Sequence, residues 1–266
     1  MPLVRPLPAL ALAALGSCAA GAPPRAAQDE AERVVELVLE AMRAGYERHD
    51  ATAYLALWAD DARLTGGRGE LPGRYDFTLD RSSIEAAQSI RFCGTPPRYS
   101  FDFERAEGRV DGDEARLRTV TVLDFEGGFE REGEIYRLRR TPDGWRLFEN
   151  RWWPIAEVVG DETLHFDAAL WRELDARVAR LEGAADPRER ARALGAAYRF
   201  EECCSAWRRV TERDDARAAD WAEYGRRALQ VGEAGEALRA FRVALELDPA
   251  APVPPHARAY LAASRP

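Results

Sequence analysis

Residues 218–249 are the stretch of this chain that most limits how it can fold. Small side chains recur at four positions where two helices could approach closely: Gly225, Ala228, Ala237 and Ala244. Large apolar side chains at helical spacing would fill the seam: Trp221, Tyr224, Leu238 and Phe241. Gly232 lies where the chain must turn, and Pro249 ends the second helix. The stretch therefore predicts a tight helical hairpin.

The same stretch resembles a single tetratricopeptide repeat. The order and spacing of that family are matched by Trp221, Tyr224, Gly225, Ala237, Phe241 and Ala244. One repeat cannot bury its own apolar faces, so neighbouring helices are required. Residues 194–210 are similar to a degenerate second unit, and we expect about six helices from Leu164 onward. The resemblance implies a helical stack that holds a partner protein; the alternative is an ordinary hairpin that binds nothing.

The N-terminus resembles a bacterial lipoprotein signal peptide over residues 1–17. An apolar run, Leu7–Leu15, precedes the lipobox-like Leu15-Gly16-Ser17-Cys18, which implies lipidation of Cys18. Ala19, where Asp would favour the inner membrane, implies the outer membrane facing the periplasm. Residues 18–28, rich in Ala and Pro, would form a tether. The alternatives are an ordinary secretory signal with a chance cysteine, or a misassigned start codon.

Composition excludes several classes of function. The net charge is −8, with 46 acidic and 38 basic residues, which argues against nucleic acid as a partner. The chain has no lysine, so a phosphate-binding loop lysine and a Schiff-base lysine are excluded. Its three histidines, His49, His165 and His256, are too scattered to predict a zinc site or a histidine-based triad. We therefore expect no metal and no cofactor.

Three cysteines remain besides Cys18: Cys93, Cys203 and Cys204. They show no Cys-x-x-Cys spacing, and two of them are neighbours on a predicted helix. We interpret them as small buried apolar residues. A disulfide from Cys93 to one of the others is the alternative.

Residues 29–155 predict an α+β cone, with helices packed in a curved antiparallel sheet. Helical periodicity covers residues 31–48, a short helix surrounds 54–58, and a capping box at Ser82–Glu85 opens a third helix. The period then switches to alternation in the strands that begin near Tyr99. An all-α helical-repeat domain over residues 164–266 would follow this cone.

This middle domain resembles the SnoaL-like branch of the nuclear transport factor 2-like superfamily. The residues that carry the resemblance are His49-Asp50, the segment Leu55–Ala62 and the last strand, Asp143–Leu147. The resemblance implies a cone with an open pocket. Some members are isomerases, dehydratases or cyclases, while many are ligand binders or dimerisation modules, so fold alone does not give function.

The candidate pocket residues follow from strand alternation and from the resemblance. We predict that the pocket is formed by Glu149, Arg151, Trp145, Tyr46, Tyr54 and Trp58. Glu149 and Arg151 would hold a polar ligand, or Glu149 would act as a general base. The alternative is an ion pair of Glu149 with Arg137, Arg139 or Arg116. Family members often have histidines at these positions, so the departure weakens any acid–base role.

Three hypotheses of function follow. The first is a membrane-anchored interaction or ligand-binding module of the cell envelope, with a protein partner on the helices, a small ligand in the cone, or a second copy in a homodimer. The second is a lipoprotein enzyme with isomerase- or dehydratase-type acid–base chemistry. The third is a purely structural pairing of two domains. The missing lysine and the few histidines favour the first. We also expect the two domains to have separate cores, so that Gly225→Leu would affect only the helices.

Overall fold

The computed structural model describes residues 25–95, 99–125, 128–159, 162–183 and 186–264. The predicted signal peptide and Cys18 lie outside the described residues. The cone consists of α1 (Arg25–Tyr46), α2 (Ala51–Ala56), β1 (Trp58–Gly66), β2 (Phe77–Asp80), α3 (Arg81–Arg91), β3 (Tyr99–Asp111), β4 (Glu114–Phe125), β5 (Gly128–Thr141), β6 (Gly144–Val159) and β7 (Glu162–His165). The helical part consists of α4 (Ala168–Arg180), α5 (Pro187–Ala196), α6 (Phe200–Thr211), α7 (Ala218–Gln230), α8 (Ala234–Leu247) and α9 (Pro255–Ala263). Across these described ranges, no helix combines the length and apolarity that crossing a membrane requires.

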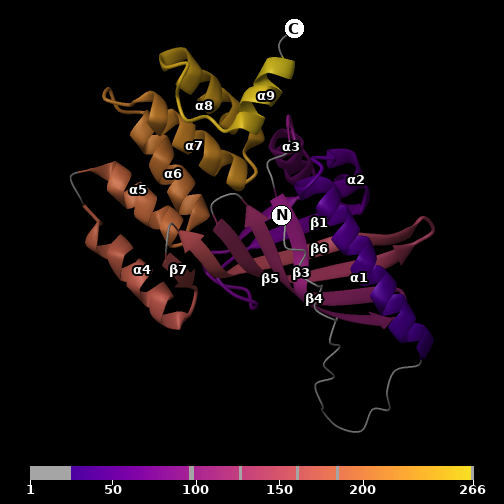
Figure 1. The fold of residues 1–266 in the computed structure, drawn as a ribbon. Helices are drawn as coiled ribbons and strands as arrows, with labels where there is room; N and C mark the ends of the chain where they lie inside the picture. Colours follow the sequence, from indigo (N-terminus) through magenta and orange to yellow (C-terminus); the bar gives the residue numbers. More distant parts are fainter. Residues whose placement is uncertain (1–24, 96–98, 126–127, 160–161, 184–185, 265–266) are drawn as a thin grey trace, which may run out of the picture.

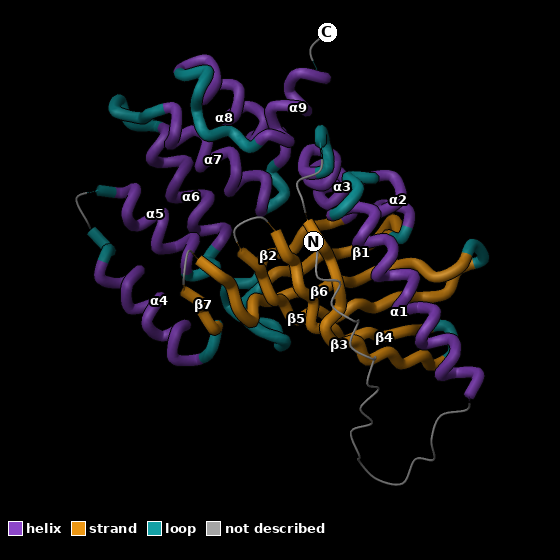
Figure 2. The backbone as a smooth tube through the Cα atoms, viewed as in Figure 1, coloured by secondary structure: helices purple, strands orange, loops and turns teal. Residues whose placement is uncertain are grey.

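One sheet of seven strands is formed by the described residues of the cone (Figure 1). Its order is β2-β1-β6-β5-β4-β3, and β7 pairs with β6. β1 runs parallel to β6, and the other pairs are antiparallel. Figure 2 shows α1 crossing the sheet, with α2 and α3 at its upper end. The α+β cone that the sequence predicts is therefore present.

Alternation along the strands decides which side chains face the helices. In β4, Leu117 and Thr121 are fully buried, whereas Arg116 and Arg118 are exposed. α1 packs closely on β3 at Gly108, where an added Cβ would lie 3.2 Å from the carbonyl oxygen of Ala31. The backbone of α1 thus packs directly on the backbone of β3 at the inner face of the sheet.

Six described helices, α4–α9, form the helical part. The close approach predicted for residues 218–249 occurs between α7 and α8, where a Cβ added to Gly225 would lie 2.5 Å from Cε1 of Phe241. Ala237 and Ala244 are fully buried in this seam, and Trp221 is partly buried. The turn between the two helices uses a left-handed backbone at Gly232, with φ of 82°.

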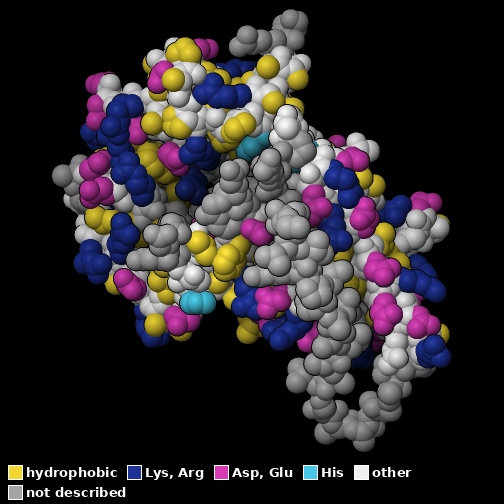
Figure 3. Space-filling view, in the orientation of Figure 1, with side chains coloured by type: hydrophobic (Ala, Val, Ile, Leu, Met, Phe, Trp, Pro, Cys, Tyr) yellow, Lys and Arg dark blue, Asp and Glu magenta, His cyan; other side chains and the backbone are white. Residues whose placement is uncertain are grey.

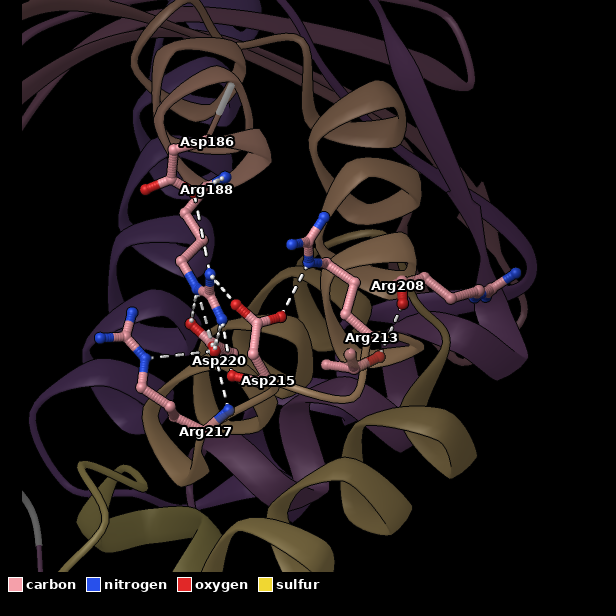
Figure 4. Close-up of polar contacts among 8 residues, drawn as sticks. Asp186, Arg188, Arg208, Arg213, Asp215, Arg217 and Asp220 are labelled. Carbon is pink, nitrogen blue, oxygen red and sulfur yellow. Dashed lines mark hydrogen bonds and ion pairs between the residues drawn. The ribbon is translucent and has the colours of Figure 1, made fainter. Parts of the chain in front are cut away.

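A buried ion-pair network joins α5 to the start of α7 (Figure 4). Arg188 is 7% exposed and donates from Nε and Nη2 to the Asp220 carboxylate, at 3.0 and 2.9 Å. Arg188 also donates to the carbonyl oxygen of Asp215 at 3.0 Å, and the Arg217 amide donates to Asp220 at 2.8 Å. Burial alone would raise the pKa of Asp220, but Arg188 and the Arg217 amide hold it below its ordinary value. Breaking a buried pair of this kind typically costs about 3–5 kcal/mol.

All three described cysteines are free. Cys203 and Cys204 lie buried in the core of the helical part, and Cys93 is partly buried. The structure therefore agrees with the reading of Cys203 and Cys204 as buried small residues and has no disulfide from Cys93.

The cone and the helical part each have a core, but these two cores pack directly against each other and exchange residues, so they are less separate than the sequence led us to expect. Phe200 of α6 belongs to the core of the cone, with its ring 5.4 Å from that of Phe77. Ala87 and Ile90 of α3 belong in turn to the core of the helical part. The sheet also continues past the predicted domain end at residue 155, because β6 runs to Val159 and β7 follows.

A polar link adds to this apolar contact. Arg68, in the loop after β1, donates to both carboxylate oxygens of Asp175 in α4, at 2.8 and 2.9 Å. The same guanidinium donates to the carbonyl oxygen of Ala197 at 2.8 Å. The two parts are thus joined by shared cores and by a paired arginine.

Gly225→Leu tests this coupling. We expect the leucine to overpack the seam against Phe241 and to lower the free energy of unfolding by about 1–3 kcal/mol. Hydrogen exchange followed by mass spectrometry should show faster global exchange in β4 as well as in α7, because the two cores are joined. Gly235→Ala is the matched control, since a Cβ there meets nothing within 4 Å. Unchanged protection in β4 would show that the cone unfolds independently.

Candidate functional site

A cavity of about 340 Å³ lies between the cone and the helical part. The sheet contributes side chains from β4, β5 and β6, and α1 and α3 close it from the other side. Leu229 and Gln230 at the end of α7 and His256 of α9 complete the wall. The site therefore needs both parts of the chain.

Three glutamates from β5 line this cavity. Glu130, Glu132 and Glu134 stand at alternate positions of one strand, so their side chains share its inner face. Both carboxylate oxygens of Glu134 are held, by Thr121 Oγ1 at 2.7 Å and by Asn150 Nδ2 at 3.0 Å. Among the described residues, neither Glu130 nor Glu132 receives a hydrogen bond or an ion pair. The cavity thus contains two carboxyl groups with free acceptor positions.

The surroundings disfavour ionisation of these carboxyl groups. Burial raises the pKa of Glu132 well above its ordinary value, and repulsion from Glu134 and Glu130 adds to the effect. Burial and then Glu157 raise the pKa of Glu130, with Arg91 opposing them. Burial also raises the pKa of Glu134, although its hydrogen bonds from Thr121 and Asn150 oppose the shift. A carboxyl group with a raised pKa can donate a proton in its neutral form and accept one in its ionised form.

Arg91, at the end of α3, supplies the positive charge that lines the cavity. It forms no ion pair with any carboxylate among the described residues. Burial lowers the pKa of His49 below its ordinary value. Burial, followed by repulsion from Arg91, lowers the pKa of His256 to about 4. Both histidines are therefore neutral at physiological pH.

Two cavity side chains hold polar atoms without a partner among the described residues. Gln88 is 3% exposed, and its Oε1 is buried without a hydrogen bond. Nδ1 of His49 is likewise buried and unpartnered, and the residue has a left-handed backbone with φ of 54°. Unpartnered buried groups and backbone strain both cost free energy, and both concentrate at functional sites. Asp50 next to it caps α2 as predicted, accepting from the Ala53 amide at 2.9 Å.

Aromatic rings form much of the remaining wall. Tyr46 stacks on Phe101, with ring centroids 5.3 Å apart, and meets Phe92 edge to face at 5.5 Å. Tyr54 and Trp152 also line the cavity. Burial raises the pKa of Tyr46 to about 12, so its hydroxyl stays protonated. Of the described residues, no group of three or more His, Cys, Asp or Glu side chains is arranged to hold a metal ion.

The structure brings together only part of the predicted pocket. Tyr46 and Tyr54 line the cavity, and Trp58 packs behind Tyr54 with ring centroids 5.7 Å apart. Trp145 lies away from the cavity, where its indole Nε1 donates to Glu30 at 2.8 Å.

The prediction that Glu149 and Arg151 face the pocket is wrong. In the β5–β6 ladder, Leu138 pairs with Leu147 and Arg137 pairs with Glu149, so Phe148 is an extra residue in a β-bulge. The bulge shifts the alternation by one residue and turns Glu149 to the outer face. There Glu149 pairs with Arg137 at 3.3 Å, which is the alternative that the sequence left open.

Arg151 also lies on the outer face, where it has a structural role. It is 7% exposed and pairs with Asp76 at 2.8 Å. It also donates to the carbonyl oxygens of Gly69 and Leu71, at 3.1 and 2.7 Å. These contacts hold the loop between β1 and β2 against the sheet.

The same bulge directs Asn150 and Trp152 into the cavity, where the sequence analysis had not placed them. The glutamates of β5 were also missed, although a signal existed. They alternate in register with Tyr136 and Leu138 of the same strand, so they lie on the same face as these two fully buried residues. A strand that continues an apolar inner face with three acidic residues indicates a polar cavity.

Comparisons with known proteins give only distant similarities. No protein-family model matches this chain, and no curated protein matches it. An NTF2-like protein of unknown function from Pseudomonas putida KT2440 is 18% identical, with a TM-score of 0.40 over 52% of this chain and 95% of its own. An NTF2-like protein with a cystatin-like fold from Novosphingobium aromaticivorans is 22% identical, with a TM-score of 0.37 over 49% of this chain and 87% of its own. A third, from Pseudomonas aeruginosa, is 17% identical, with a TM-score of 0.38 over 46% of this chain and 96% of its own.

The raised pKa of Glu132 has a consequence for stability. A carboxyl group whose pKa is higher in the folded state than in the unfolded chain destabilises the fold as the pH rises above the unfolded value, about 4.3. Glu132→Gln should therefore raise the melting temperature at neutral pH, and the gain should shrink to nothing at about pH 4.

The matched control is Glu149→Gln, which removes an exposed ion pair and should change stability by less than about 0.5 kcal/mol. Melting curves of both variants across this pH range provide the measurement. A loss of stability in Glu132→Gln that is the same at every pH would contradict the assigned burial of this carboxyl group.

Proposed function

We propose that this chain is a lipid-anchored, ligand-binding protein of the bacterial cell envelope, and that the ligand occupies the cavity between the cone and the helical part. The observation that carries the proposal is the cavity itself. Its volume of about 340 Å³ lies within the range of small-molecule sites, and apolar and aromatic walls surround a few convergent polar groups. Unpartnered atoms of Gln88 and His49 are the kind of group that a ligand satisfies.

The helical part is proposed to contact a protein partner. The close packing of Gly225 on Phe241 and the buried Ala237 and Ala244 support a tetratricopeptide-type unit in α7–α8. On the face shown in Figure 3, acidic and basic side chains are interspersed over both parts. This mixture and the net charge of −8 favour a protein over a nucleic acid, and a second copy of the chain is one such partner.

One observation favours acid–base catalysis as the second candidate. Glu132 is a partly buried carboxyl group with a raised pKa in a largely apolar cavity, which is a common setting for a general acid or base. An isomerase or dehydratase would exchange ligand protons with solvent, whereas a binding protein would not. Recovery of a bound ligand from D₂O, followed by mass spectrometry, distinguishes the two, because deuterium on carbon requires catalysis.

Filling the cavity tests ligand binding. Leu123, which lines the cavity and is 8% exposed, would be replaced by tryptophan. A ligand at one hundred times its Kd stabilises a fold by about 2.7 kcal/mol. In a thermal-shift screen of neutral, cationic and anionic small molecules, compounds that stabilise the wild type should fail to stabilise Leu123→Trp.

Leu71→Trp is the control, because Leu71 is 80% exposed and is not among the residues that line the cavity. It should respond to each compound as the wild type does. Equal stabilisation of Leu123→Trp would place binding elsewhere. A wild type that responds to no compound of any charge class would contradict the proposal.

The anchor has its own test. Cys18 follows the lipobox-like Leu15-Gly16-Ser17, outside the described residues. Cys18→Ala should leave the protein unprocessed or release it from the outer membrane, since acylation of this cysteine would be the attachment. Fractionation of cells and the mass of the N-terminal peptide provide the readout. A wild type without lipid on Cys18, and a variant that stays in the membrane fraction, would exclude the anchor.

A further inference from the structure

We propose that the cavity takes a small organic cation, a protonated amine joined to an apolar or aromatic body, with Glu132 as the counter-ion. This inference rests on the proposed ligand-binding function and adds the chemical class of the ligand.

The charged groups of the cavity are mostly acidic. Among the described residues, Glu130, Glu132 and Glu134 face it together with a single guanidinium, that of Arg91. Glu134 is already held at both oxygens by Thr121 and Asn150. Glu130 and Glu132 have no partner among the described residues. Even with Arg91 beside one of them, a carboxyl group remains that has no donor among the described residues and can accept one from a ligand.

Two neutral acceptor atoms also favour a cationic ligand, and this evidence is independent of the acidic residues. Gln88 is 3% exposed, lines the cavity, and leaves its Oε1 without a hydrogen bond. Nδ1 of His49 is buried and unpartnered at the same cavity, and the lowered pKa of this imidazole keeps it neutral. An ammonium group has three donors and no acceptor, so it fits a site that offers unpaired acceptors.

The rest of the wall suits an apolar body. Tyr46, Phe92 and Phe101 form an aromatic cluster, with ring centroids 5.3 and 5.5 Å from Tyr46. Trp152 and Leu123 face the same space. Aromatic faces attract cations as well as apolar groups, so this wall stabilises both ends of an aromatic amine.

Binding of a cation should be linked to release of a proton. Empty, the cavity favours the protonated form of Glu132, because burial and its acidic neighbours oppose ionisation. A bound cation favours the ionised form, so affinity should rise with pH. The other titratable groups that face or adjoin the cavity are Glu130, Glu134, Glu157, Arg91, Tyr46, Tyr54, Tyr136, His49 and His256. Of these, His49 becomes more neutral as the pH rises, which acts in the same direction, whereas the pKa of His256, about 4, keeps it largely neutral above about pH 5.

Three probes of nearly equal size and different charge test the proposal: benzylamine, benzyl alcohol and benzoate. Isothermal titration of the chain that begins at residue 18 should show benzylamine binding about tenfold more tightly than benzyl alcohol, and benzoate more weakly still. The affinity for benzylamine should be higher at about pH 8 than at about pH 5, a range in which the amine stays protonated.

Two variants test whether Glu132 is the group that pairs with the ammonium of benzylamine. Glu132→Gln should lower the affinity for benzylamine about tenfold, leave that for benzyl alcohol unchanged and remove most of the pH dependence. Glu149→Gln, the same change on the outer face, should behave as the wild type does. Melting curves confirm that each variant is folded.

Equal or tighter binding of benzyl alcohol or benzoate would overturn the cation, while the ligand-binding function would stand. An unchanged affinity for benzylamine in folded Glu132→Gln would overturn the counter-ion. Failure of all three probes, together with failure of every compound in the thermal-shift screen, would overturn both the cation and the function beneath it.

Discussion

Helix α3 is the element on which the rest of this structure depends, because three of its faces are used. Ile84 packs in the core of the cone, whereas Ala87 and Ile90 pack in the core of the helical part. Gln88 and Arg91 line the cavity between them. An amphipathic helix on a protein surface has one apolar stripe. In contrast, α3 presents one apolar face to each of the two cores and a polar face to the cavity. The cavity lies beside α3, where the two cores adjoin.

The sequence predicted the architecture well, because periodicity reports local structure. The helices near 31–48 and 54–58, the switch to strands and the helical C-terminal part all follow from it. Small errors arose at the ends of elements. The predicted capping box at Ser82 is one such error, since Asp80 caps α3 by accepting from the Ser83 amide at 2.8 Å.

The candidate site was predicted much less well, because a face assignment depends on every residue of the strand. One extra residue, Phe148, moved Glu149 from the predicted pocket to an ion pair with Arg137 on the outer face. A bulge of this kind has no clear signature in a single sequence. The contribution of His256 was also invisible, because it comes from α9, far along the chain, and requires the two parts to pack together. Tyr46 and Tyr54 lie on helices whose periodicity has no bulge, and both line the cavity.

The destabilising features of this chain support a functional site more strongly than its distant similarity to known structures does. A partly buried carboxyl group without a partner among the described residues, an unpaired amide oxygen and a left-handed histidine each reduce stability. Glu132, Gln88 and His49 bring all three to one cavity. Two buried arginines away from the cavity are paired instead, as the Arg188–Asp220 pair and the contacts of Arg151 demonstrate. Destabilising residues that cluster at one place are expected where function requires them. A ligand that forms hydrogen bonds or ion pairs with these groups would stabilise the folded state, and it would bind where α3 contacts both cores.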